Sequence, residues 1–450
     1  MLNYIWLALI LCAVAIGGWN DRLKEVTDGA FDGAKTAVTI ALGLIGIMAL
    51  WLGVMRLAER AGLVQRVART LRPILKKLFP DVPADHPAMG SMVMNMAANM
   101  LGLGNAATPL GLRAMRDLET LNPRPGVATN AMCTFLAINT SSVQLIPTTA
   151  IAILAASGSA RPTAIVGTAL LATLCAATVA IVSVKALEKL PWFRLPEPSN
   201  GNVPAAVGNV AQPAEPTSPT DANLHSDHDH ALPPPRWWGS VLIVLLLLFF
   251  AVLFVRMVSP QWFNAAADIT SGNVFVRSVN ALSILAIPFL LGFFPLYAAV
   301  RGLKVYDEFV EGAKEGFGVI LKIIPFLVTM LVAISMFKAA GGVDLLTRAL
   351  NPILTPLHFP SELVPLALMR PLSGSGTLAL LTKLVHDLGP DNIVSLMGAT
   401  IYGSTETTFY VAAVYFGAVG IKRTRHAIPA GLLADLAGVI ASVVICRAVL

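Results

Sequence analysis

Charged residues are scarce in this chain of 450 residues, where Asp, Glu, Lys and Arg together make up 13%. A soluble globular chain carries about 25% charged residues, so the composition excludes an ordinary soluble enzyme and a disordered chain. Hydrophobic residues make up 56%, and several apolar runs reach the roughly 20 residues that a helix needs to cross a bilayer. The sequence therefore predicts an all-α, polytopic membrane protein.

Sequence motifs of the common catalytic and metal-binding classes are also missing. The four cysteines lie far apart inside apolar runs, which indicates neither a disulfide framework nor a metal site. There is no G-x-x-x-x-G-K-[ST] for nucleotide phosphates, and neither H-E-x-x-H nor G-x-S-x-G occurs. We expect no enzyme activity, no cofactor and no bound metal.

Positive charge is concentrated in a few loops, so the net charge of +6 indicates topology and no nucleic-acid partner. The apolar run 2–19 lacks a preceding basic residue and a following A-x-A site, and is interpreted as a retained helix. After a second run at 36–55, the basic segment 56–88 is predicted to be a cytoplasmic loop. The N-terminus is then cytoplasmic and the C-terminus outside, in a bacterial cytoplasmic (inner) membrane.

Two apolar elements, 89–121 and 361–383, are interrupted by glycine and polar residues. Flanking charges place both ends of each element on one side of the membrane, which predicts two re-entrant hairpins. Such backbone is tolerated at membrane depth only where it is buried in protein or lines a cavity.

The two halves of the chain resemble each other. An offset of 279 aligns Gly33 with Gly312, and an offset of 264 aligns 139–142 with 403–406. A helix near 239–255 has no counterpart and would invert the second half, giving about nine transmembrane helices plus two hairpins in an inverted-topology repeat. The predicted units are a first repeat at 1–195, a disordered cytoplasmic linker at 196–236, a topology-inverting helix at 237–277 and a second repeat at 278–450.

The linker composition is rich in Pro, Asn, Ala and acids, which is typical of disorder. It contains His225, His228 and His230 beside two aspartates. We interpret this tract as solvated polar chain, with weak metal collection as the alternative.

Four polar clusters lie at predicted membrane depth, two in the hairpins and two where long apolar runs break. Broken helices expose backbone N–H and C=O groups that bind anionic groups and cations, and the polar side chains add hydrogen bonds. The alternative role for isolated Ser and Thr is to hold helices together. The candidate solute-binding residues are Asn95, Asn99, Gly102, Gly104, Asn105, Thr108, Asn139, Thr140, Ser141, Ser142, Gln144, Arg370, Ser373, Ser375, Thr377, Ser404, Thr405, Glu406 and Thr407.

Arg370 and Glu406 are the two charged residues in these clusters. A charge in the bilayer centre costs about 2.5–3.5 kcal/mol even on the lenient insertion scale, so each needs a partner or water. They could form a structural salt bridge, or Arg370 could reach the membrane surface. Alternatively, Glu406 binds a coupling cation (H⁺ or Na⁺) or a substrate amine, and Arg370 binds an anionic group. A zwitterionic solute would use both.

The segment NMAANMLGLGNAATPLGLRAM (95–115) resembles spore maturation protein A, and MRPLSGSGTLALL (369–381) with IYGSTETTFYVAAVYFGAVGIKRTRHA (401–427) resembles spore maturation protein B. The chain thus resembles a fusion of the two over roughly 1–190 and 278–450. Both belong to the nucleoside-recognition Gate group, which is similar to parts of concentrative nucleoside transporters and of a ferrous-iron transporter. This resemblance implies a membrane protein with Gate-type hairpins.

These observations predict a secondary transporter of a small polar solute, such as a nucleoside, a cell-wall peptide fragment or a dicarboxylate, that works by alternating access. One alternative is a membrane scaffold for cell-envelope assembly, in which Arg370 and Glu406 could be exchanged without loss. The other is divalent metal-ion transport, which the histidine tract would favour. The expected partners are membrane lipid and the solute, with a second copy of the chain in a homo-oligomer.

Overall fold

The computed structural model describes residues 2–102, 104–193, 237–259, 273–342 and 359–450, with positions 345, 348 and 352. Every element within these residues is a helix, apart from a single bridge between Val127 and Arg423. The predicted all-α fold is confirmed. The linker 196–236, its histidine tract and part of 237–277 lie outside the described residues.

Five helices of the described chain are long and apolar enough to cross a membrane, which fits a multi-pass membrane protein. The number of spans, their sidedness and the unit boundaries remain predictions. Two other apolar stretches, 130–156 and 393–417, are each divided between two shorter helices. The five long helices are α2 (Leu23–Arg60), α8 (Ile165–Leu187), α10 (Trp237–Val258), α11 (Val274–Val300) and α18 (Ala427–Val449).

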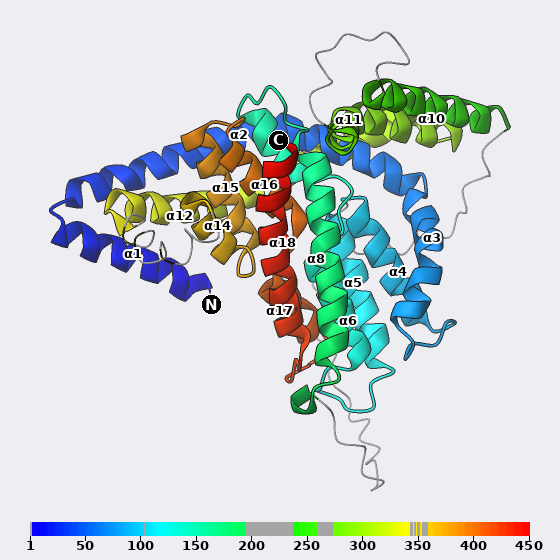
Figure 1. Cartoon of the computed structure of the whole chain (residues 1–450), viewed down its shortest axis with the longest axis horizontal. Helices are drawn as coiled ribbons and strands as arrows, with labels where there is room; N and C mark the ends of the chain where they lie inside the picture. Colours follow the sequence, from blue (N-terminus) through cyan, green and yellow to red (C-terminus); the bar gives the residue numbers. More distant parts are fainter. Residues whose placement is uncertain are drawn as a thin grey trace, which may run out of the picture.

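The long helices α2 and α12 (Val305–Ala339) lie side by side, and α1 (Leu2–Trp19) packs along the other side of α12 (Figure 1). Helices α8 and α18 cross the middle of the same view next to each other, while α10 and α11 pack together at one edge. The C-terminal end of α2 meets the N-terminal end of α12, where Arg56 Nε and Glu308 Oε2 form an ion pair at 3.0 Å.

Close approach of α2 and α12 depends on glycine. A Cβ atom on Gly33 would lie 2.7 Å from the carbonyl oxygen of Leu331, and one on Gly312 would lie 2.6 Å from that of Leu52. The offset of 279 that relates Gly33 to Gly312 also relates Leu52 to Leu331. The two aligned helices therefore run antiparallel and make the same contact twice.

The second offset, 264, also relates two helices that pack on each other. Gly438 of α18 lies against Ala176 of α8. Further along the pair, both Thr168 of α8 and Cys446 of α18 are bonded to Thr400. From the first contact to the second, the residue numbers fall along α8 and rise along α18, so the two helices are antiparallel (Figure 1).

The charge pattern predicted a loop at 56–88, but α2 extends to Arg60 and α3 (Leu63–Leu78) forms a further 16 residues of this basic segment. Leu63, Val64, Ala68 and Leu75 are buried on one face, and the basic residues occupy the other face. This amphipathic spacing favours a helix with one packed side.

Both predicted hairpins consist of two short helices joined by a sharp break. The first contains α4 (Pro87–Met100) and α5 (Gly104–Glu119), and the second contains α14 (Val364–Met369) and α15 (Gly374–Leu388). Helix α4 begins with a proline, which is favoured at the first position of a helix. Helix α15 is capped by Ser373, whose hydroxyl accepts a hydrogen bond from the N–H of Gly376 at 3.0 Å.

We expect Gly33→Ala and Gly312→Ala to destabilise the protein by about 1–3 kcal/mol, because each methyl group would overlap a facing backbone atom. Thermal unfolding in detergent measures the effect. Gly46→Ala on α2 and Gly318→Ala on α12 are matched controls, since nothing lies within 4 Å of a Cβ at either position. Equal unfolding temperatures for all four variants would contradict the close-packing argument.

Candidate functional site

Four breaks in helices lie near one another. Two are the hairpin tips described above. The third separates α6 (Asn130–Ser141) from α7 (Thr148–Ala156), and the fourth separates α16 (Ile393–Ser404) from α17 (Thr408–Gly417). The first half of the chain and the second half each contribute two breaks.

Backbone hydrogen bonds tie the breaks together. The N–H of Leu145 donates to the carbonyl of Met100 at 3.0 Å, and the N–H of Glu406 donates to the carbonyl of Thr140 at 2.7 Å. The N–H of Phe409 donates to the carbonyl of Pro371 at 3.0 Å. The N–H groups of one helix break therefore bond to carbonyl groups of another, and backbone polar groups away from water need such partners.

A cavity of about 240 Å³ lies where the breaks meet α2 and α12. Each of the four breaks or its flanking helix contributes to the lining. Apolar side chains of α2 and α12, including Trp51 and Ile320, complete the wall. The predicted residues that line the cavity are Asn99, Gly102, Gln144, Arg370 and Glu406.

Arg370 and Glu406 form the charged part of this cavity. Their Nη2 and Oε2 atoms lie 3.8 Å apart, with the Arg370 side chain 3% exposed and that of Glu406 38% exposed. Arg370 Nη2 also donates to the carbonyl of Tyr402 at 3.0 Å, and its guanidinium lies over the Tyr402 ring, 4.9 Å from the centroid. The arginine is held from several sides, whereas the carboxylate is accessible from the cavity.

Side-chain amides from the first half of the chain face this pair. Gln144 Nε2 donates to Glu406 Oε1 at 3.2 Å. Asn99 Nδ2 donates to Asn139 Oδ1 at 3.0 Å, which links the first hairpin to α6. One half therefore supplies neutral amides and the other supplies both charges.

The remaining predicted residues with described side chains do not line the cavity, and several have local structural bonds. Asn95 Nδ2 donates to the carbonyl of Ala107 at 2.7 Å, and Thr377 Oγ1 donates to that of Ser373 at 2.6 Å. The side chains of residues 104 and 105 lie outside the described residues. The predicted residues that are described but do not line the cavity are Asn95, Thr108, Asn139, Thr140, Ser141, Ser142, Ser373, Ser375, Thr377, Ser404, Thr405 and Thr407.

Sequence reasoning missed two residues. Tyr402 contacts Arg370 through both its ring and its carbonyl, which no motif reveals. Asp435 lies buried on α18 behind the break at Thr408. It is the one acid in the apolar run 427–449, and an acid within such a run is a functional candidate in its own right.

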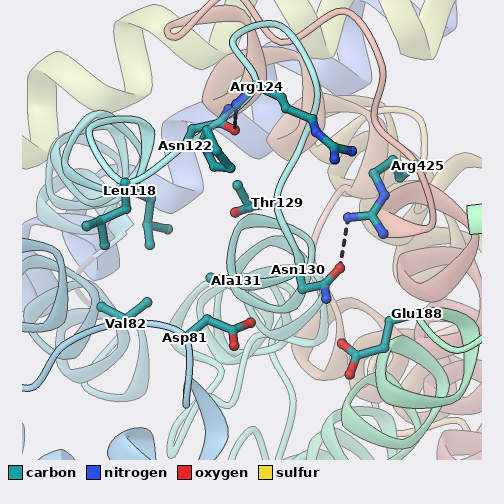
Figure 2. Close-up of a pocket in the computed structure, with 12 residues that line it drawn as sticks. Asp81, Val82, Leu118, Asn122, Arg124, Thr129, Asn130, Ala131, Glu188 and Arg425 are labelled. Carbon is teal, nitrogen blue, oxygen red and sulfur yellow. Dashed lines mark hydrogen bonds between the residues drawn. The ribbon is translucent and has the colours of Figure 1, made fainter. Parts of the chain in front are cut away.

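A second cavity, of about 630 Å³, lies at the other end of α6. Figure 2 shows the carboxylates of Asp81 and Glu188 near Asn130, together with the hydrogen bond from Arg425 to Asn130, which measures 2.8 Å. Arg425 has a positive φ of 50°. It also donates to the carbonyls of Ala128 and Phe193, so it holds the cavity wall in place.

His426 precedes α18 beside this second cavity. Its imidazole is fully buried, and neither nitrogen has a hydrogen-bond partner among the described residues. Burial lowers the pKa of His426 from 6.5 to about 4, with the positive charges of Arg425 and Lys185 acting in the same direction.

The geometry defines a multi-pass membrane protein with a polar cavity built from broken helices. A family model described as "Nucleoside recognition" (Gate) matches residues 41–157 and 320–422. Spore maturation protein A of Bacillus subtilis (strain 168) is 47% identical over 182 residues, which are 40% of this chain and 93% of that protein. Spore maturation protein B of the same organism is 45% identical over 167 residues, 37% of this chain and 94% of that protein.

The chain belongs to the spore maturation protein A/B family of Gate proteins. This confirms the resemblance that its motifs indicated. No solved structure matches the chain.

We expect Glu406→Gln to lower the free energy of unfolding by about 1–3 kcal/mol, because it leaves the buried guanidinium of Arg370 without its carboxylate. The Arg370→Gln/Glu406→Gln double variant should lose less than the sum of the two single variants. A double-mutant cycle on chemical or thermal unfolding measures this coupling. Glu311→Gln, at an exposed position on α12, is the control. Additive losses in the double variant would contradict an interaction between the Arg370 and Glu406 side chains.

We expect the protein to lose stability as pH falls from 6.5 towards 4, partly through His426. In this window the unfolded chain takes up a proton at His426 that the folded chain does not, so acid favours unfolding. His426→Gln should unfold with a smaller pH dependence than the wild type. Identical slopes for His426→Gln and the wild type would refute the assignment.

Proposed function

We propose that this protein is a secondary transporter that moves a small polar solute across the bacterial cytoplasmic membrane by alternating access. The observation that carries the proposal is the convergence of four helix breaks, two from each half of the chain, on one cavity containing Arg370 and Glu406. Helix breaks at membrane depth are typical of solute and ion sites in transporters. Duplication for packing alone does not require a charged cavity.

The antiparallel pairs α2/α12 and α8/α18 support an inverted repeat. Each pair joins helices that the sequence offsets relate, so the two halves meet across an approximate two-fold axis. In transporters of this architecture the site lies at the repeat interface, and one repeat moves against the other. The hairpins α4–α5 and α14–α15 would be the moving parts.

The chemistry of the cavity favours a solute with both an anionic and a cationic or hydrogen-bonding group. Arg370 would bind the anionic group, while Glu406 and Gln144 would bind an amine or amide. The volume of about 240 Å³ is below the roughly 300–1,000 Å³ of cavities for drug-sized ligands. A nucleoside-like compound, an amino acid, a short cell-wall peptide or a dicarboxylate are the solutes to test.

The second cavity would serve as the cytoplasmic vestibule of the transport path. Arg124 and Arg425 contribute to its lining, and by the positive-inside rule arginines outside the spans favour the cytoplasmic side. Divalent metal transport receives no comparable support, since the described residues contain no group of three or more His, Cys, Asp or Glu that could hold a metal.

A ligand panel tests this function on the purified full-length protein. Nucleosides, amino acids, muropeptides, dicarboxylates and divalent metals would be screened by thermal shift, with Na⁺ or at varied pH. A ligand at 100 times its dissociation constant stabilises a protein by about 2.7 kcal/mol. We expect one class to raise the unfolding temperature of the wild type and of Glu311→Gln, but not of Glu406→Gln.

Uptake of the same solute into proteoliposomes then distinguishes transport from binding. A scaffold would show no hit in the panel, and would keep its stability when Arg370 and Glu406 are exchanged with each other. That pair of results would overturn the transporter proposal.

A further inference from the structure

Asp435 is a buried carboxyl that the proposed solute site does not use. Its side chain is on α18, the residue is 2% exposed, and Oδ2 accepts a hydrogen bond from Thr408 Oγ1 at 2.6 Å. Among the residues that the structure describes, none forms a hydrogen bond with Oδ1. Within the described chain, no lysine or arginine forms an ion pair with this carboxyl.

The surroundings of Asp435 are polar but neutral. On the same face of α18, Gly431 lies against Thr408 and Thr140, and Gly438 lies against Thr405. One turn beyond Gly438, Ser442 Oγ lies 3.2 Å from Ser404 Oγ. These residues are almost completely buried, so the carboxyl of Asp435 is shielded from bulk solvent and its immediate neighbours carry no charge.

The nearest charges are already paired. Arg370 and Glu406 act on Asp435 electrostatically, one attracting a negative charge and the other repelling it. They lie 3.8 Å from each other in the cavity, so their effects on Asp435 partly cancel. The other titratable groups on elements packed against α18 are Cys133 on α6, Cys175 and Lys185 on α8, Arg277 and Tyr297 on α11, Tyr402 on α16, and Tyr410 and Tyr415 on α17.

We propose that Asp435 is the proton-binding carboxyl of this transporter, and that Glu406 binds solute. An uncompensated buried carboxylate costs several kcal/mol, and a carboxyl in such a place binds a proton instead. Glu406, by contrast, has Arg370 and Gln144 as direct partners in the cavity. The inference rests on the proposed transport function and assigns its coupling ion as H⁺.

Three consecutive residues link this carboxyl to the solute cavity. Thr408 donates to Asp435. Thr407 Oγ1 accepts from Arg370 Nη1 at 3.4 Å, and the N–H of Phe409 donates to the carbonyl of Pro371 in the second hairpin. When the O–H bond of Asp435 breaks, the proton leaves to water and the electron pair stays on the carboxylate. The resulting anion attracts both the Thr408 hydroxyl and Arg370. Loss of the proton would therefore shift the start of α17 and the tip of the second hairpin together.

Infrared difference spectroscopy of the full-length protein in detergent tests the assignment without any solute. We expect the wild type to show the carbonyl stretch of a protonated carboxylic acid at neutral pH. Asp435→Asn, which has nearly the same shape, should lose this band entirely, whereas Glu406→Gln should keep it. Thermal unfolding of each variant checks that it is folded.

A second variant keeps the proposal testable if Asp435→Asn does not fold. Thr408→Val removes the hydroxyl that donates to Asp435, so the band should persist to higher pH than in the wild type, while Thr408→Ser should behave like the wild type. A band that survives in Asp435→Asn would overturn the proposal. So would a band that Na⁺ abolishes at constant pH when choline does not, because Asp435 would then bind Na⁺. The two results that would overturn transport, no ligand hit and unchanged stability on exchange of Arg370 and Glu406, would leave the infrared result unaffected.

Discussion

The structure depends on satisfying backbone polar groups where helices break in an apolar environment. A lone break at membrane depth would leave several N–H and C=O groups unpaired, each costing several kcal/mol. Here Thr140, Met100 and Pro371 offer carbonyls to N–H groups of a different break. The breaks can therefore exist only together, which explains why the polar residues of both halves are found at one place.

Much of the fold follows from composition and charge, because apolar run length and loop charge report directly on helices in lipid. The interruptions around Gly102 and Ser373 identify the hairpins for the same reason. Helix α3 was missed because its basic face outweighs its four buried residues in the composition. A periodicity of 3.6 residues was the signal that would have revealed it.

The candidate site was predictable as a set of residue types, but not as a set of contacts. Arg370 and Glu406 are conspicuous as charges in apolar surroundings, and they do meet in the cavity. The pairing of Asn99 with Asn139 requires knowledge of how a hairpin packs on α6. Asp435 was not predicted because it stands alone in an apolar run and belongs to none of the clusters of polar residues on which the prediction was based.

The uneven sharing of polar groups between the halves has a consequence for recognition. Duplicated halves with identical linings would present the same environment to either end of a bound molecule. In this cavity Asn99 and Gln144 come from one half and both ionic groups from the other. The electric field across the cavity is therefore directional, and under the proposed function it would favour one orientation of an asymmetric solute. Under the proposed function, the divergence of the two copies would thus distinguish one end of the solute from the other.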